Sequence, residues 1–218
     1  MTLLEFARGP LLAVALIVFF AGSIWRIYGI FRFKPKPDHS KPRKAVGFSD
    51  ALQGVRARVF PRKEFRTRIA FTEANAWLFH IALLLIIVAY APHIAFVKRL
   101  TGFISWPALP DAVTYFCGAT AIVTLIIALL HRMSHPPLRL LSNFDDFFSW
   151  FITLLAVVTG MMAFDYNSAR TDTVLAIHLI AVEVLLIWLP FGKLSHAFLI
   201  FISRGITGAA FARKGASL

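Results

Sequence analysis

The chain has 218 residues, of which 58% are hydrophobic, and its mean hydropathy is +0.72. This composition excludes an ordinary soluble domain and indicates an integral membrane protein. The formal net charge of +12 would favour nucleic-acid binding in a soluble protein. Here the basic residues cluster between apolar stretches, which is typical of membrane proteins with a preferred orientation and gives no reason to expect nucleic acid.

Five stretches are apolar and long enough, at about 20 residues, to cross a bilayer as helices. They cover residues 11–30, 74–97, 112–130, 147–164 and 173–202. We expect the fifth to be continuous past Pro190, with Glu183 inside it. The first lacks the basic start and the cleavage site of a signal peptide, so we interpret it as an uncleaved helix. The sequence therefore predicts an all-α integral membrane protein, a single domain over residues 1–218 built as a five-transmembrane-helix bundle.

The basic residues lie mostly on one side of these spans. The segment 32–70, between the first two spans, holds Arg32, Lys34, Lys36, Lys41, Arg43, Lys44, Arg56, Arg58, Arg62, Lys63, Arg66 and Arg68. The same side adds Arg132, Arg139, Lys193, Arg204, Arg213 and Lys214, whereas the other side has Arg8, Lys98, Arg99 and Arg170. The positive-inside rule then predicts an outer N-terminus and a cytoplasmic C-terminus.

The basic segment 32–70 is not uniform. Residues 34–44 are rich in Pro and Lys, which favours an extended chain. Residues 49–60 predict a short amphipathic helix with Leu52, Val55 and Val59 on one face. Such a helix either lies on anionic lipid headgroups or docks a cytoplasmic partner, and the sequence supports both interpretations equally.

The single cysteine, Cys117, excludes a disulfide within the chain and a cluster held by four thiolates. The sequence has no C-x-x-C-H motif, which excludes covalently attached c-type haem. We expect Cys117 to be a packing residue. Any iron–sulfur cluster that works with this chain must therefore belong to a partner.

Four histidines lie in or at the ends of two spans, where ionisable residues are costly and usually functional. His80 and His93 lie early and late in the second span, and His178 and His196 lie early and at the end of the fifth. Because the two spans are antiparallel, His80 matches the depth of His196, and His93 that of His178. On a continuous helix His178 and His196 share one face, about 27 Å apart. Each pair would offer two neutral imidazoles to one haem iron, so we expect two haems b, and one at least.

The weaker member of the second pair is His93. It lies thirteen residues after His80, about 140° around an ideal helix. Pro92 precedes it and can kink the helix so that His93 turns inward. Tyr90, ten residues after His80, marks the alternative position for this ligand.

Other titratable residues receive simpler interpretations. We expect Asp145 and Asp146 to cap the fourth span. His39 is expected to be solvated, and His131 and His135 to serve a surface or interface. For Glu183 a structural role is favoured over proton exchange at a quinone site.

Several motifs carry a family resemblance: Leu78-Phe79-His80-Ile81, Ile177-His178-Leu179, Leu189-Pro190-Phe191-Gly192-Lys193-Leu194-Ser195-His196, and Gly22-Ser23-Ile24-Trp25-Arg26 at the end of the first span. With them the chain resembles the cytochrome b (gamma) subunit of respiratory nitrate reductases. It is also similar to the membrane cytochromes of heterodisulfide-reductase-like complexes. The resemblance implies a bundle enclosing two haems b in the cytoplasmic membrane of a bacterium or archaeon, with quinol oxidation near the outer haem.

Three departures from the nitrate reductase pattern matter. Tyr90 stands where that pattern has the second histidine of the second span. The basic segment is longer, which suggests a different cytoplasmic partner. The lysine near the quinone site has no clear equivalent, and Lys98 and Arg99 are the candidates.

The expected function is electron transfer between a menaquinone or ubiquinone pool and a cytoplasmic partner, an iron–sulfur or heterodisulfide-reductase-like subunit. The quinone site is expected near His178, His93 and Lys98. The alternatives are a haem-free membrane anchor and a small proton-coupled transporter. A transporter would favour matched Gly/Pro interruptions in two halves of the chain, which the sequence lacks.

Overall fold

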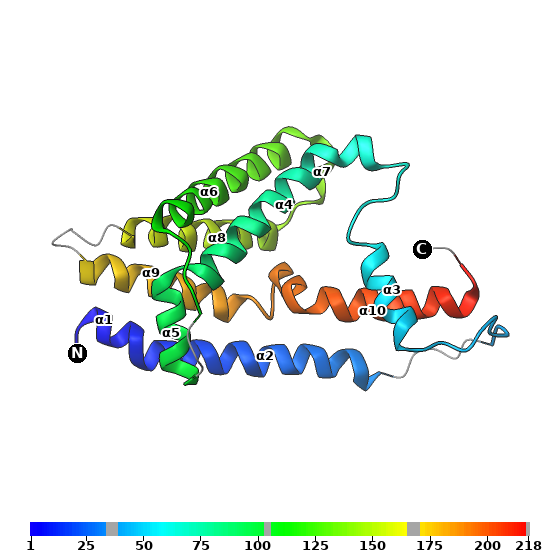
Figure 1. The fold of residues 1–218 in the computed structure, drawn as a ribbon, viewed down its shortest axis with the longest axis horizontal. Helices are drawn as coiled ribbons and strands as arrows, with labels where there is room; N and C mark the ends of the chain where they lie inside the picture. The colour runs from blue at the N-terminus through cyan, green and yellow to red at the C-terminus, as the bar shows by residue number, and fades with distance from the viewer. Residues whose placement is uncertain (34–38, 103–105, 165–170, 217–218) are drawn as a thin grey trace. The chain divides into compact units, whose positions relative to one another are not determined.

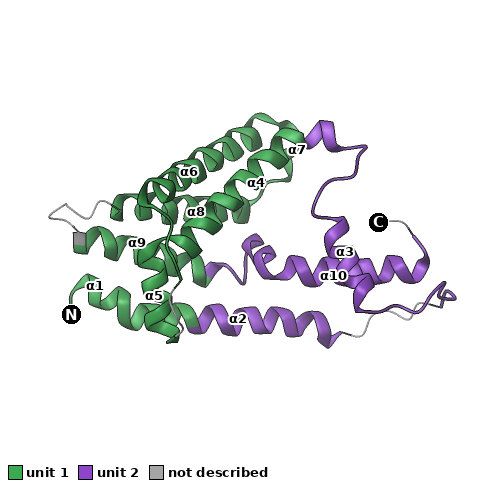
Figure 2. Cartoon of the chain, viewed as in Figure 1, with its two compact units in different colours: residues 1–16, 70–187 green, residues 17–69, 188–218 purple. Residues whose placement is uncertain are grey.

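The structure, a computed structural model, describes residues 1–33, 39–102, 106–164 and 171–216. Over these ranges the chain is helical and contains no strand, which confirms the all-α prediction (Figure 1). The chain divides into two compact units (Figure 2), and the interpretation of residues 1–218 as one membrane domain stays a prediction. Unit 1 comprises residues 1–16 and 70–187, and unit 2 comprises residues 17–69 and 188–218. The predictions for Lys34, Lys36 and Arg170 concern residues outside the described ranges.

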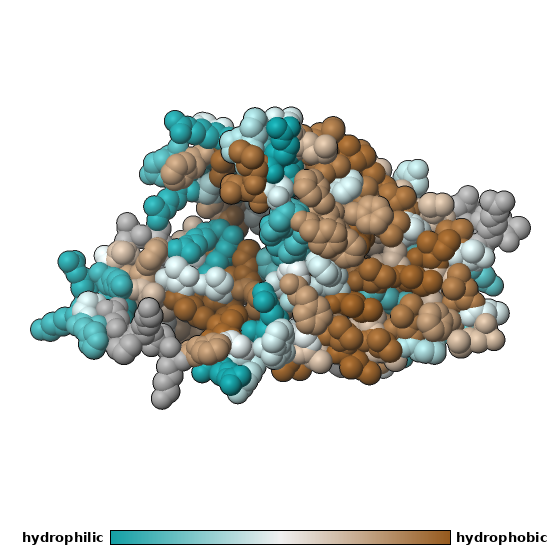
Figure 3. Space-filling view, turned by 180° about the vertical axis from the view of Figure 1, so that it is seen from behind, coloured by the Kyte–Doolittle hydropathy of each residue, from teal (hydrophilic) through white to brown (hydrophobic). Residues whose placement is uncertain are grey.

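Five helical segments of the described chain are long and apolar enough to cross a membrane. They are Leu3–Arg32, Arg66–Ala89, Asp111–Ser134, Phe144–Ala163 and Lys193–Lys214. The first four overlap the first four predicted spans. Many large apolar side chains on them are exposed, such as Ile17 at 67% and Phe116 at 70%. Broad apolar areas are visible in Figure 3, as expected for a multi-pass membrane protein whose helices face lipid.

Unit 1 contains most of the helices. In chain order its elements are α1 (Leu3–Phe6), η1 (Ala7–Leu11), the start of α2 (Leu12–Arg32, up to residue 16), α4 (Arg66–Ala89, from residue 70), α5 (Ala91–Thr101), α6 (Asp111–Ser134), α7 (Pro136–Leu141), α8 (Phe144–Ala163) and α9 (Thr171–Trp188, up to residue 187). Helices α4, α6 and α8 meet in a core of small residues, namely Ala82, Cys117, Ala121 and Val157. Small residues let membrane helices approach closely. The prediction that Cys117 is a packing residue is confirmed.

The start of α8 is capped much as the sequence predicts. Asn143 is the cap residue, and its backbone N–H donates to Asp146 at 3.0 Å, while its side chain accepts from the backbone N–H of Asp146. Asp146 also forms an ion pair with Arg132 at 3.1 Å. Asp145 accepts a hydrogen bond from Ser149. Both aspartates therefore hold the first turn, where negative charge is favourable.

The continuous fifth helix was a wrong prediction. Helix α9 ends at Trp188, whose carbonyl accepts from the N–H groups of Phe191 and Gly192. A short 3₁₀ turn, η2 (Lys193–Ser195), leads into α10 (His196–Lys214). Pro190 has no N–H to donate and cannot continue the ladder, so the chain turns instead of kinking. Because the helix is interrupted, His178 and His196 do not share a face of one helix. The spacing derived for a continuous helix does not apply.

Unit 2 contains α2 (Leu12–Arg32, from residue 17), α3 (Phe48–Ala57), η2 and α10. A glycine in α2 accommodates the break before α10. A Cβ atom on Gly22 would lie 2.9 Å from the Cβ of Pro190 and 3.1 Å from the ring of Phe191. The turn around Pro190 can therefore pack directly against the α2 backbone.

Helix α3 confirms the short helix predicted in the basic segment. The buried residues are Asp50 and Gly54, whereas Leu52 is 48% exposed. Gly54 meets Gly208 of α10 backbone to backbone, and Ala51 lies beside Gly205. A crossing this close requires residues without a Cβ atom, so glycines and not the Leu-Val stripe determine the contact.

Asp50 stabilises the start of α3. Its carboxylate accepts from the backbone N–H of Gly47 at 2.9 Å and from the ammonium of Lys44 at 2.5 Å. These partners, Lys44 first, lower the pKa of Asp50 from its usual value. In its charged form, the Asp50 carboxylate therefore fixes the start of α3.

Acidification is expected to loosen α3. Because the folded pKa of Asp50 is depressed, its contribution is present above the ordinary aspartate pKa of about 4 and is lost as the pH falls through the lower folded value. Hydrogen exchange of α3, corrected for intrinsic rates, should accelerate below about pH 4. Asp50→Asn should exchange rapidly already at neutral pH. A wild-type profile that stays as protected in acid as at neutrality would contradict this assignment.

Candidate functional site

The structure brings together two of the four predicted histidines within unit 1. The rings of His93, on α5, and His178, on α9, have centroids 6.4 Å apart and planes inclined by only 19°. Metal–imidazole bonds are about 2 Å long, so two imidazoles that bind one metal ion from opposite sides have ring centres roughly 6 Å apart. The separation of the two ring centres is therefore of the size that such a pair would have.

A break in the second span turns His93 towards His178. Helix α4 ends at Ala89, Tyr90 is extended (φ −82°, ψ 129°), and Pro92 lies in the first turn of α5. The prediction that the chain bends near Pro92 is confirmed, with the break at Tyr90. His93 Nδ1 then lies 2.8 Å from the carbonyl oxygen of Ile86, in the last turn of α4. Carbonyls at a helix end lack partners within the helix, so the break itself supplies this acceptor.

His178 is positioned by two neighbouring residues of α8. Its Nδ1 lies 3.2 Å from Thr159 Oγ1, whose own hydrogen is directed to the carbonyl of Leu155 at 2.7 Å. The hydroxyl oxygen therefore accepts from Nδ1–H. The next residue is Gly160, where a Cβ atom would lie 3.0 Å from His178 Cε1. Sequence reasoning missed both residues; the Thr-Gly pair gives no signal until α8 and α9 are placed side by side.

All four predicted histidines have the same ring nitrogen engaged. His80 Nδ1 lies 2.7 Å from the carbonyl of Ala76, and His196 Nδ1 lies 2.7 Å from that of Lys193. A carbonyl can only accept, so Nδ1 carries the hydrogen and Nε2 carries the lone pair. Metal-binding histidines usually donate their second N–H in this way, which fixes the tautomer and the ring orientation.

The predicted pairing of His80 with His196 is a separate question. His80 belongs to unit 1, whereas His196 belongs to unit 2. Each ring has the tautomer that ligation needs, but their pairing stays a prediction.

Aromatic side chains flank the His93 ring. Tyr90, the alternative ligand position, lies edge-on to His93 with centroids 5.2 Å apart and stacks on Phe164 at 5.4 Å. Tyr115 meets Phe164 in turn, at 5.9 Å. The structure therefore makes Tyr90 a neighbour of the predicted ligand His93. The aromatic rings thus pack in a row from Tyr115 through Phe164 and Tyr90 to His93.

Comparison with known proteins places the chain in a family. A relative from Nitratidesulfovibrio vulgaris, strain Hildenborough, is 34% identical over 215 residues, which are 96% of this chain and 93% of the relative. This chain belongs to that protein's family. The relative is named only "Protein", and this name states no activity. No family model matches the chain.

Glu183 is a deeply buried acidic residue on α9, the helix that carries His178. It lies five residues after His178 on α9, is 1% exposed, and has no hydrogen-bond partner for either carboxylate oxygen in the described chain. Lys98 and Arg99, the candidates for a quinone-site cation, lie exposed in the last turn of α5. They are five and six residues beyond His93 and so belong to the same short helix.

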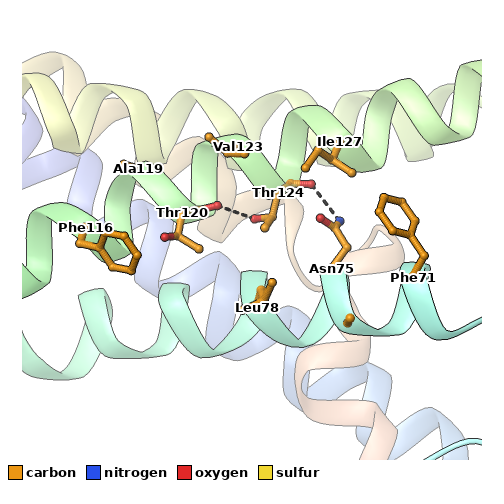
Figure 4. Close-up of a pocket in the computed structure, with 10 residues that line it drawn as sticks. Phe71, Asn75, Leu78, Phe116, Ala119, Thr120, Val123, Thr124 and Ile127 are labelled. Atoms are coloured by element: carbon orange, nitrogen blue, oxygen red, sulfur yellow. Dashed lines mark hydrogen bonds between the residues drawn. The ribbon is translucent and has the colours of Figure 1, made fainter.

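A groove between α4 and α6 is distinct from the histidine pair. It has a volume of about 540 Å³ and is lined mainly by apolar side chains, including Leu78, Phe116 and Val123. Among its polar residues, Asn75 donates to the carbonyl of Thr124 at 3.0 Å, and the Thr124 hydroxyl donates to the carbonyl of Thr120 (Figure 4). None of the four predicted histidines lines the groove.

Proposed function

We propose that the chain is a haem-binding membrane subunit of a redox complex, which passes electrons between a quinone pool and a partner protein. The observation that carries the proposal is the near-parallel pair His93 and His178, 6.4 Å apart, with Nδ1 engaged on both rings. Two neutral imidazoles on opposite faces are what low-spin haem b requires. A haem b bound in this way supplies a reversible one-electron carrier.

The residues around the pair would hold such a group in a defined orientation. Thr159 and the carbonyl of Ile86 fix the two rings through their Nδ1–H groups. Gly160 leaves room for the His178 ring, and Tyr90 shields His93 on one side. Burial and ligand orientation are the means by which a protein sets a haem potential.

A second haem b, between His80 and His196, is part of the proposal. Both rings have the required tautomer. Two carriers at different depths would connect the outer leaflet, where quinol would release its protons, with the cytoplasmic side. Lys98 or Arg99 would orient the quinone oxygens near His178 and His93, because cations favour the developing negative charge of a reduced quinone.

The partner would be an iron–sulfur or heterodisulfide-reductase-like subunit on the cytoplasmic side. The chain has one cysteine, so it does not supply the thiolates for a cluster. The surplus of Lys and Arg in segment 32–70 favours a cytoplasmic position for that segment, an outer N-terminus, and a cytoplasmic membrane location.

Haem and iron quantitation on the purified full chain tests the proposal directly. We expect two haems b per chain and a b-type difference spectrum between reduced and oxidised protein. His196→Ala should remove one of the two, whereas the control His135→Ala should remove neither. A chain that purifies intact without haem would instead favour a membrane anchor or a proton-coupled transporter.

A further inference from the structure

Helices α3 and α10 form a fixed pair within unit 2. Gly54 and Gly208 meet at the crossing, and the guanidinium of Arg58 lies 5.2 Å from the ring centre of Phe211. Upstream, the backbone N–H of Arg43 donates to the carbonyl of Arg213 at 3.0 Å. These contacts fasten the basic segment to the C-terminal half of α10 and determine which side of α3 is presented outwards.

The outward side of α3 combines apolar and basic residues. At about 100° per residue, Phe48, Leu52 and Arg56 lie on one stripe, opposite Asp50 and Gly54. Phe48 is 85% exposed, Leu52 is 48% exposed, and Arg56 is exposed as well. Two large apolar side chains one turn apart, followed by a cation, are typical of a helix lying in a membrane interface.

The surrounding segment is strongly basic. Residues 39–69 contain nine Lys and Arg residues and only two acidic ones, Asp50 and Glu64. Asp50 is neutralised by its ion pair with Lys44. The uncompensated positive charge is complementary to anionic lipid headgroups.

The position of Arg204 indicates how α10 lies. The helical segment Lys193–Lys214 satisfies the length and composition of a span, but Arg204 stands at its middle. Helix α3, with Arg56 and Arg58, packs against the same region. A transmembrane α10 would bring these charges into the hydrocarbon core, which is costly, so an orientation along the interface is favoured.

We propose that α3 and the C-terminal half of α10 form an interfacial helix pair that binds the anionic phospholipids of the chain's own bilayer. Phe48 and Leu52 insert at the boundary between headgroups and acyl chains, and Arg56 and its basic neighbours contact lipid phosphates. The segment joins α2 to α4, two helices that are apolar enough to span the membrane, which keeps it at the bilayer surface. A soluble protein partner on this stripe is the competing occupant. The proposal does not depend on haem binding.

The test measures the surroundings of single fluorescent labels on the full chain in nanodiscs. In a Cys117→Ala background, cysteines replace Phe48 or Leu52 on the stripe, and Gln53 or Ala57 on the flank as matched controls. Quenching by nitroxide-labelled lipid and by aqueous iodide is compared between phosphatidylcholine alone and its mixture with phosphatidylglycerol.

With phosphatidylglycerol, labels at 48 and 52 should be quenched by the lipid nitroxide and protected from iodide, and the flank labels should change much less. Arg56→Gln should lower the ratio of membrane-bound to unbound α3 about fivefold, because it removes one cation near an anionic surface. High salt should act in the same direction. Labels at 48 and 52 that remain equally open to iodide in both lipids would overturn the proposal and assign the stripe to a soluble partner.

Discussion

His178→Ala is expected to lose one of the two haems, with the remaining b-type absorbance intact. The imidazole of His178 lies opposite that of His93, and Ala offers no donor atom to take its place. His93→Ala should lose the same haem, so the double variant should match either single variant. Pyridine haemochrome quantitation on purified protein measures all three.

Neighbouring variants separate ligation from positioning. Thr159→Val keeps both imidazoles but removes the hydrogen bond to His178 Nδ1, so haem should be retained with an affinity lower by roughly 10- to 100-fold and a shifted midpoint potential. His131→Ala, on the surface of α6, should behave as wild type. If Tyr90→Phe lost the haem and His93→Ala kept it, the ligand would have to be placed at Tyr90.

The sequence predicted the helices better than their interruptions. Runs of apolar residues report burial in lipid, so four of the five spans were located from composition alone. Pro92 is expected to kink its span and Pro190 to leave its helix continuous, but both lie at helix interruptions. Pro92 lies in the first turn of a new helix, where its missing N–H costs nothing, whereas Pro190 lies in the turn that follows the end of α9 at Trp188. How the chain continues at each proline depends on tertiary packing, such as the contact of Gly22 with Pro190. The sequence of a single segment does not contain that information.

In the candidate site, too, the sequence indicated some residues and gave no signal for others. The histidines were visible because ionisable residues are rare in apolar spans. The bend that turns His93 inward followed from Pro92. Thr159 and Gly160 had no such signal, because a threonine and a glycine in an apolar helix usually serve packing; only the placement of His178 gives them a role. The contact of α3 with α10 had no sequence signal for a related reason, since hydrophobic periodicity does not register a contact made by glycine backbones.

Gly54→Leu is expected to detach α3 from α10. A Cβ atom at Gly54 would overlap the backbone of Gly208, and backbone atoms cannot move aside as a flexible side chain can. Overpacking of this kind costs about 3 kcal/mol at the upper end of the usual range, which raises the detached fraction roughly a hundredfold. Trypsin cleavage after Arg56 and Arg58, measured on the full chain, should accelerate accordingly, and Gly208→Leu should have the same effect from the other side. Gly29→Leu is the matched control, because Gly29 lies in α2 with open space around its Cα atom. Equal cleavage rates for Gly54→Leu and Gly29→Leu would show that the glycine crossing does not hold the basic segment in place.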